Sequence, residues 1–141
     1  MIPKFRGISI DDDSKGKMQY GYPIADGEQA FIINEVVEAN EQYITIGSWC
    51  PVDQKTIGQS TGLKDKNGKE IFEGDIIANG IDIVDIKRHQ TLGFYTIIDG
   101  IESFFGNNIS IEGFEKDVEE FTQITEIIGN IYENPELFEV E

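Results

Sequence analysis

The amino-acid sequence predicts a mostly β protein with one short helix near residues 113–121. Short runs of β-branched and aromatic residues alternate with glycine, proline, asparagine and aspartate, a pattern typical of strands joined by turns. Helical periodicity is convincing at one place, where Phe114, Val118 and Phe121 recur at i, i+4 and i+7. The length of 141 residues suits a single domain over residues 1–141, with possible lobes at 1–55 and 56–141.

In the first third of the chain, short apolar runs separated by polar segments predict four strands. In order, we expect a strand at 1–6, an acidic turn at 11–17, strands at 18–23 and 31–33, a loop at 34–42 and a strand from 43 to 52. Trp49 is predicted to anchor the core, because a side chain of that size is usually buried. Cys50 has no basic neighbour to activate it and is predicted to be an inert thiol.

The middle of the chain, residues 56–77, is punctuated by glycines at positions 58, 62, 68 and 74. Residues 65–68 read Asp-Lys-Asn-Gly, which predicts a tight turn before a buried strand at 75–77. Residues 81–88 largely alternate apolar and charged side chains, which predicts a strand with one buried face. A turn at 89–93 and a returning strand at 94–98 follow, so residues 70–98 resemble a small SH3-like or open-barrel element.

The C-terminal third begins with an aromatic segment at 101–111 that is either a strand pair or a packed loop. After the helix, residues 122–128 predict a strand, and the Gly129–Asn130 pair predicts a kink in it. Residues 136–138 are expected to form a last helical turn after Pro135.

Three features suggest a phosphate, calcium or catalytic site, but each lacks the spacing, the residue types or the partners that such a site needs. Gly62 and Gly68 are separated by five residues instead of four, and Glu70 stands where a phosphate-binding loop needs a hydroxyl. Residues 11–16 place aspartates at positions one and three of a calcium loop, but positions five and twelve are lysine and tyrosine. His89 has no neighbouring metal ligand or orienting partner in the sequence, and is expected to be a turn residue. We therefore predict no catalytic, cofactor-binding or metal-binding residues.

The charge is strongly negative and uneven. The chain has 11 basic and 27 acidic residues, for a net charge of −16, and residues 99–141 contain one lysine among twelve carboxylates. This field disfavours direct binding to nucleic acid, which depends on lysine and arginine displacing counterions. A single cysteine, no apolar run of membrane-spanning length and no signal-peptide core lead us to expect a cytoplasmic protein without membrane contact.

Three segments, residues 4–6, 56–77 and 128–137, resemble parts of the YopX family of phage and prophage proteins. Residues 56–77 are similar to the central signature, residues 128–137 to the closing one, and Lys4-Phe5-Arg6 to the opening strand. The chain departs from the family at Gly7-Ile8-Ser9, where a Trp-Asp pair is usual, and at Ser60, where an aromatic residue is usual. The resemblance implies a mostly β protein in the cytoplasm of an infected or lysogenic bacterium, and no established activity. The residues that carry the signature, and to which we assign structural roles, are Gly58, Gln59, Thr61, Gly62, Asp65, Asn67, Gly68, Glu73, Gly74, Asp75, Gly129, Asn130, Tyr132, Asn134 and Pro135.

Three classes of function follow. The leading hypothesis is a non-enzymatic module that binds a protein partner or copies of itself as a homo-oligomer, because strand edges and aromatic residues favour such contacts. The second is an acidic mimic of DNA that inhibits a host nucleic-acid-binding protein. The third is a hydrolase that uses the carboxylates of Asp75, Asp82 and Asp85, although Asp82 and Asp85 would face opposite sides of a regular strand.

Overall fold

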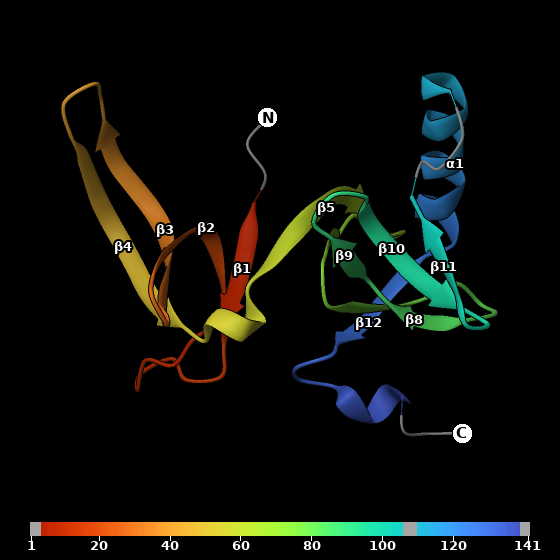
Figure 1. Ribbon diagram of the computed structural model, residues 1–141, viewed down its shortest axis with the longest axis horizontal. Helices are drawn as coiled ribbons and strands as arrows, with labels where there is room; N and C mark the ends of the chain where they lie inside the picture. Colours follow the sequence, from red (N-terminus) through yellow and green to blue (C-terminus); the bar gives the residue numbers. More distant parts are fainter. Residues whose placement is uncertain (1–3, 106–109, 139–141) are drawn as a thin grey trace. The chain divides into compact units, whose positions relative to one another are not determined.

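The computed structural model describes residues 4–105 and 110–138 and confirms a mostly β fold (Figure 1). Twelve strands, one α-helix and two short 3-10 helices make up the described part of the chain. The chain divides into two compact units, residues 1–60 and 61–141, so the boundary lies five residues beyond the one considered from the sequence. The two units are described separately below.

The N-terminal unit is an antiparallel arrangement of strands. Along the chain its elements are β1 (Phe5–Ile8), β2 (Met18–Asp26), β3 (Gln29–Ala39), β4 (Ile44–Val52), the 3-10 helix η1 (Gln54–Thr56) and the first residues of β5 (Gly58–Lys64). In space the order is β4-β3-β2-β1-β5. An isolated bridge between Ser9 and Val52 also joins the continuation of β1 to the end of β4.

One face of this sheet carries the core of the unit. Ala30, Ile32 and Val52 are buried there, and Ile57 packs against them. Gly21 lets β2 approach β3 closely: its φ is +154°, and a Cβ atom at this position would collide with the carbonyl oxygen of Ile33. The core therefore depends on a glycine at the crossing of these strands.

The predicted loop at 34–42 is wrong, because β3 continues to Ala39 and pairs with β4 almost to the turn. The register between these strands shifts at three places between Ile33 and Glu38. Such bulges insert unpaired residues and destroy the simple alternation by which a strand is recognised in a sequence. Beyond Ile33 no residue of β3 pairs with β2, so the described ends of β3 and β4 form a two-stranded arm, which Figure 1 shows extending past β2.

The C-terminal unit contains three groups of paired strands and the helix. Its elements are the rest of β5, β6 (Glu70–Phe72), β7 (Asp75–Ala78), β8 (Ile83–Asp85), β9 (Lys87–His89), β10 (Gly93–Ile98), β11 (Ile101–Phe104), α1 (Ile111–Ile124), β12 (Glu126–Asn130) and η2 (Pro135–Phe138). β5 pairs with β6, β7 lies between β12 and β8, and β10 lies between β11 and β9. The strands of the predicted SH3-like element are thus shared among three sheets, and none of these closes into a barrel within the described residues.

The predicted helix is confirmed and is longer than expected. Ser110 caps α1, since its Oγ accepts a hydrogen bond from the amide of Gly113 at 3.1 Å. Phe121 packs against a core formed by Ile71, Ile77 and Ile86. The predicted strand at 81–88 is divided: β8 ends at Asp85, Ile86 is buried, and β9 begins at Lys87.

The expected buried face of residues 81–88 is wrong in its first half. Ile81 is 91% exposed and Ile83 is 50% exposed, whereas Ile86 is 1% exposed. Ile81 lies in the turn that precedes β8, where Asn79 Oδ1 accepts hydrogen bonds from the amides of Ile81 and Asp82. The alternation of apolar and charged residues therefore begins in a turn, where successive side chains do not line the two faces of a strand.

The segment at 101–111 forms β11 over Ile101–Phe104, and residues 106–109 of that expectation lie outside the described residues. The same holds for the first three residues of the expected opening strand. The strand predicted at 122–128 is wrong over residues 122–124, which form the end of α1, and is confirmed from Glu126 onward as β12. The expected kink corresponds to a register shift between Ile127 and Gly129, and the expected helical turn is confirmed as η2.

Candidate functional site

The central signature forms a turn that Asp65 joins to a distant strand. The Oδ1 atom of Asp65 accepts hydrogen bonds from the amides of Asn67 and Lys69, both at 2.9 Å. Its Oδ2 atom accepts one from the amide of Ile127 at 3.0 Å. Asp65 is 2% exposed, so all three hydrogen bonds lie largely away from water. One carboxylate thus links the 65–69 turn to the start of β12.

Burial raises the pKa of Asp65, and three backbone N–H groups together with the charge of Lys69 lower it. The lowering effects are larger, so the pKa lies below its ordinary value of 3.8. Asp65 is therefore charged at neutral pH despite its burial, and its charge is compensated by the backbone.

The other residues of the central signature also contact the backbone or shape it. Thr61 Oγ1 donates to the carbonyl oxygen of Ile71 at 2.8 Å and accepts from the amide of Leu63. Asp75 Oδ2 accepts from the amide of Phe72 at 2.7 Å. Gly58 and Gln59 pair with β1. Positive φ angles are found at Gly62, Gly68 and Gly74. A carboxylate oxygen of Glu73 lies 3.4 Å from Nε of Arg88.

The closing signature forms a second compact turn. Asn130 Oδ1 accepts hydrogen bonds from the amides of Tyr132 and Glu133 at 3.0 and 2.9 Å. Asn134 Oδ1 in turn accepts from the amide of Asn130, and Pro135 begins η2. A Cβ atom at Gly129 would lie 2.6 Å from that Asn134 oxygen, which accounts for glycine at this position.

The residues considered for catalysis or metal binding have separate local partners. Asp85 forms an ion pair with Lys87 at 3.1 Å, whereas Asp82 lies in the turn held by Asn79. His89 Nδ1 accepts hydrogen bonds from the amides that follow it in the 89–93 turn, at 3.1 and 3.0 Å. Within residues 4–105 and 110–138, no three His, Cys, Asp or Glu side chains are grouped to hold a metal ion.

Cys50 is buried and donates a hydrogen bond to Ser9 Oγ at 3.1 Å. The carboxylate of Asp11 in the acidic turn accepts from the amide of Asp13, a contact typical of a turn. These contacts give Cys50 and the acidic turn structural roles in the N-terminal unit.

The prediction that Trp49 anchors the core is wrong, because Trp49 is 59% exposed. The register places Cys50 opposite Ile32, on the core face of the sheet, and Trp49 opposite Ile33. Successive side chains of a strand point to opposite faces, so Trp49 points away from the core. Its ring packs edge-on against Phe31, with centroids 5.5 Å apart and planes inclined by 74°.

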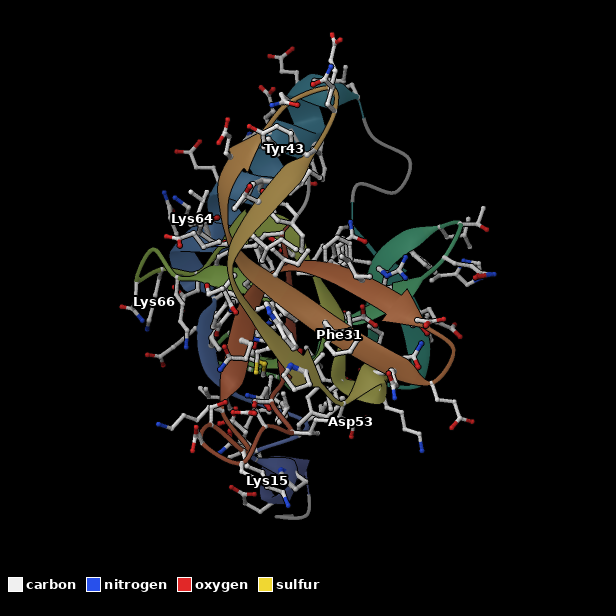
Figure 2. All side chains as sticks on the ribbon, turned by 90° about the vertical axis from the view of Figure 1, so that its left-hand side faces the viewer. Lys15, Phe31, Tyr43, Asp53, Lys64 and Lys66 are labelled. Carbon is white, nitrogen blue, oxygen red and sulfur yellow. The ribbon has the colours of Figure 1, made fainter. Side chains whose placement is uncertain are left out.

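Trp49 belongs to an apolar surface on the face of the N-terminal sheet opposite its core, which we call the outer face. A shallow groove there is lined by Ile24, Phe31, Ile33, Ile46 and Trp49. Figure 2 shows Phe31 lying over the strands of this face, with Tyr43 near the end of the arm. Ile24 is 50% exposed and Ile46 is 40% exposed.

An antiparallel sheet with one buried face normally carries polar side chains on the other. Here both faces are apolar across β2, β3 and β4. The sequence signal is the uninterrupted apolar run at residues 30–33, which indicates a strand with two apolar faces.

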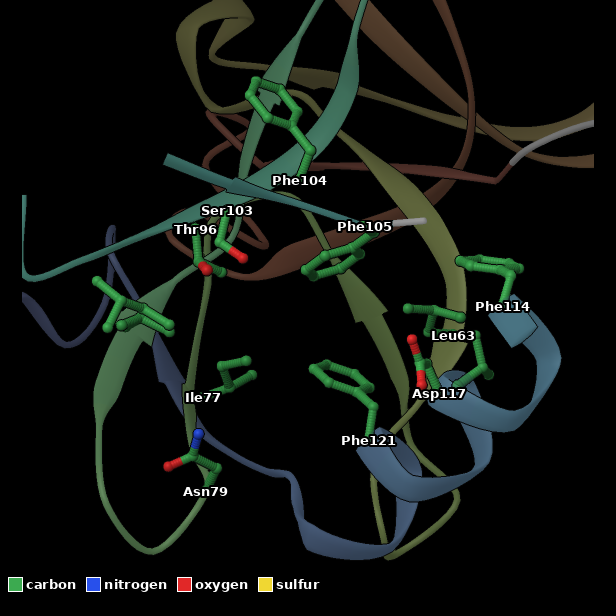
Figure 3. A pocket seen from close by; sticks show the side chains of 13 residues that line it. Leu63, Ile77, Asn79, Thr96, Ser103, Phe104, Phe105, Phe114, Asp117 and Phe121 are labelled. Carbon is green, nitrogen blue, oxygen red and sulfur yellow. The ribbon is translucent and has the colours of Figure 1, made fainter. Parts of the chain in front are cut away.

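The C-terminal unit contains a cavity of about 260 Å³ between α1 and the strands. Figure 3 shows the rings of Phe105 and Phe121 facing each other across it, and their centroids are 5.5 Å apart. Phe114 and Val118 also line the cavity, and no residue of α1 is fully buried. The cavity reflects the loose packing of a helix whose apolar face is half-covered.

No helix among the described residues has the length and apolar character needed to cross a membrane.

Comparison with known proteins agrees with the fold over almost the whole chain. A solved structure, the crystal structure of protein EF1440 from Enterococcus faecalis, is similar to 97% of this chain over 98% of its own, with 29% sequence identity and a TM-score of 0.60. No curated protein matches the chain. A family model described as YopX protein matches residues 10–139, so nearly the entire length is covered. The chain therefore belongs to the YopX family.

Proposed function

We propose that this protein is a non-enzymatic interaction module that binds another protein chain through the outer face. The observation that carries the proposal is the exposed Trp49 in a groove of four other apolar side chains. Tryptophan is enriched among the residues that dominate binding energy at protein interfaces. An exposed apolar groove of this kind is typical of a surface that another molecule covers.

The two-stranded arm supports the same assignment. Val37 and Ile44 are each 64% exposed, and Tyr43 is 48% exposed. An isolated pair of strands is marginally stable in water, and a third strand or a packed layer usually completes it. A partner that covers the outer face and the arm would supply that layer. The bound chain is a partner protein or, in the homo-oligomeric form of the proposal, a second copy.

The test compares the wild-type protein with the double variant Phe31→Ala/Trp49→Ala. The variant should lose the binding of proteins that the wild type retains from bacterial lysate, and any concentration-dependent assembly measured by light scattering should weaken with it. The matched control is Ile81→Ala, which removes a 91% exposed apolar side chain from the C-terminal unit and should change neither result. Identical retention and identical assembly for all three proteins would refute the proposal.

A further inference from the structure

We propose that the outer edge of β4 binds an extended segment of a partner protein as an added strand, and that this segment alternates apolar and basic residues. This inference rests on the proposed function, because it names the chemistry of the chain that would cover the outer face.

The first argument concerns the edge of the sheet. β4 is the last strand in the spatial order, and within the described part of the chain no strand pairs with its outer edge over residues 44–49. Further along, the amide of Ile10 donates to the carbonyl oxygen of Pro51 at 3.0 Å, so the edge is covered there. The open part spans about 20 Å at roughly 3.4 Å per residue, which is enough for a six-residue strand.

This edge lacks the charged side chains and the proline that commonly protect an exposed strand against pairing. Residues 44–49 contain no lysine, no other charged residue and no proline. Natural proteins commonly protect exposed edges with charged side chains or proline. An added strand would gain backbone hydrogen bonds from the edge, and every second side chain would lie beside Ile46 and Trp49 on the outer face.

The second argument concerns charge. Residues 18–54 contain no lysine or arginine and carry six carboxylates: Asp26, Glu28, Glu35, Glu38, Glu41 and Asp53. One of these lies at the edge itself, because a Cβ atom at Gly47 of β4 would contact the carboxylate of Glu35. The Glu35 carboxylate therefore lies above the edge strand, beside the path of an added strand.

This charge distribution selects among possible occupants. A second copy would bring the same carboxylates to the edge, and like charges across neighbouring strands destabilise their pairing. A lysine or arginine on the incoming strand would instead pair with Glu35 or its acidic neighbours. The open edge of β4, the apolar groove and the neighbouring carboxylates together favour an extended segment that carries both apolar and basic side chains.

The experiment uses a ten-residue peptide of alternating lysine and valine, with binding measured at low salt through the fluorescence of the single tryptophan. A second peptide has glutamate in place of lysine. A third keeps the lysines but is N-methylated at alternate residues, so one of its edges cannot donate hydrogen bonds. We expect the lysine peptide to bind at least about tenfold more tightly than either of the others, since one strong interface contact is worth about this factor.

Two pairs of protein variants locate the site. Glu35→Lys should weaken binding of the lysine peptide several-fold and strengthen that of the glutamate peptide, whereas Glu120→Lys, with the same charge change on α1, should have little effect. For the apolar contact, Ile46→Ala should weaken binding and Ile81→Ala should not. Thermal unfolding of each variant verifies that the fold is retained.

Any of four results would overturn the inference. Equal binding of the N-methylated peptide would indicate charge attraction without strand addition, and equal binding of the glutamate peptide would remove the role of Glu35. A Trp49-dependent dimer that excludes the lysine peptide would mean that a second copy occupies the edge, and the proposed function would survive in its homo-oligomeric form. If substitutions on the outer face alter neither peptide binding, nor assembly, nor retained proteins, both proposals fail.

Discussion

Replacing Asp65 by asparagine should destabilise the C-terminal unit. The carboxylate accepts three backbone hydrogen bonds, at 2.9, 2.9 and 3.0 Å, and it is buried. An asparagine can keep the two hydrogen bonds of Oδ1, but its NH2 group would face the amide of Ile127, which is also a donor. A hydrogen bond to a charged group contributes about 1.5–3 kcal/mol, so losing one and neutralising the others should lower the free energy of unfolding by about 2–3 kcal/mol.

The difference in the free energy of unfolding between the wild type and the Asp65→Asn variant should depend on pH. Since folding lowers the pKa of Asp65 below 3.8, the folded state favours the charged carboxylate more than the unfolded state does. The resulting stability is fully present above the unfolded pKa and is lost as the pH falls through the folded pKa. The wild type should therefore lose its advantage over Asp65→Asn in acid, at pH values below 3.8.

The assay is thermal and chemical denaturation of both proteins at pH 7 and at a series of acidic pH values, monitored by far-ultraviolet circular dichroism. At pH 7 the melting temperature of the variant should be lower by on the order of 10 °C, from about 4–8 °C per kcal/mol for a unit of this size. Amide hydrogen exchange at Ile127 should accelerate in the variant. Equal stability at pH 7, or a difference that does not shrink in acid, would refute this account of Asp65.

Three further substitutions and measurements test other features. Gly21→Ala should cost the N-terminal unit about 3 kcal/mol or more in a denaturation experiment, because the new Cβ would collide with a β3 carbonyl. Gly27→Ala, where φ is +65° and no neighbour lies within 4 Å, should cost only about 1 kcal/mol. Gly129→Ala should cost about 1–2 kcal/mol by displacing Asn134, and it should add little to the effect of Asn134→Ala in a double-variant cycle. The fluorescence of Trp49 should resemble that of an indole in water and be readily quenched by acrylamide; a blue-shifted, protected emission from the monomer would contradict its 59% exposure.

Local signals in the sequence were sufficient where neighbouring residues decide the structure. The turn at Asp65, the apolar face of α1 and the kink at Gly129 all depend on residues a few positions apart, and each is predicted correctly. The cap at Ser110 is a further local feature that the structure adds. Even so, the contact from Asp65 to Ile127 spans 62 positions, and no local pattern contains it.

Predictions failed where the environment of a side chain depends on distant strands. Trp49 is a bulky aromatic in an apolar run, and only the register with β3 reveals that it lies on the outer face. Likewise, the arm is hidden by three register shifts, and Ile81 belongs to a turn although its neighbours alternate like a strand. Strand pairing therefore creates the candidate site on the outer face. The sequence alone shows that its residues are apolar, but not that they share an exposed face.

The open edge of β4 also bears on the behaviour of the protein in solution. An edge without charge or proline is a template on which identical chains can stack into fibrous aggregates. A net charge of −16 opposes such stacking through mutual repulsion, whose range is about 10 Å at 0.1 M salt and about 3 Å at 1 M. The acidity would thus serve as colloidal protection, and concentrated solutions should remain clear at low ionic strength and become turbid as salt is added.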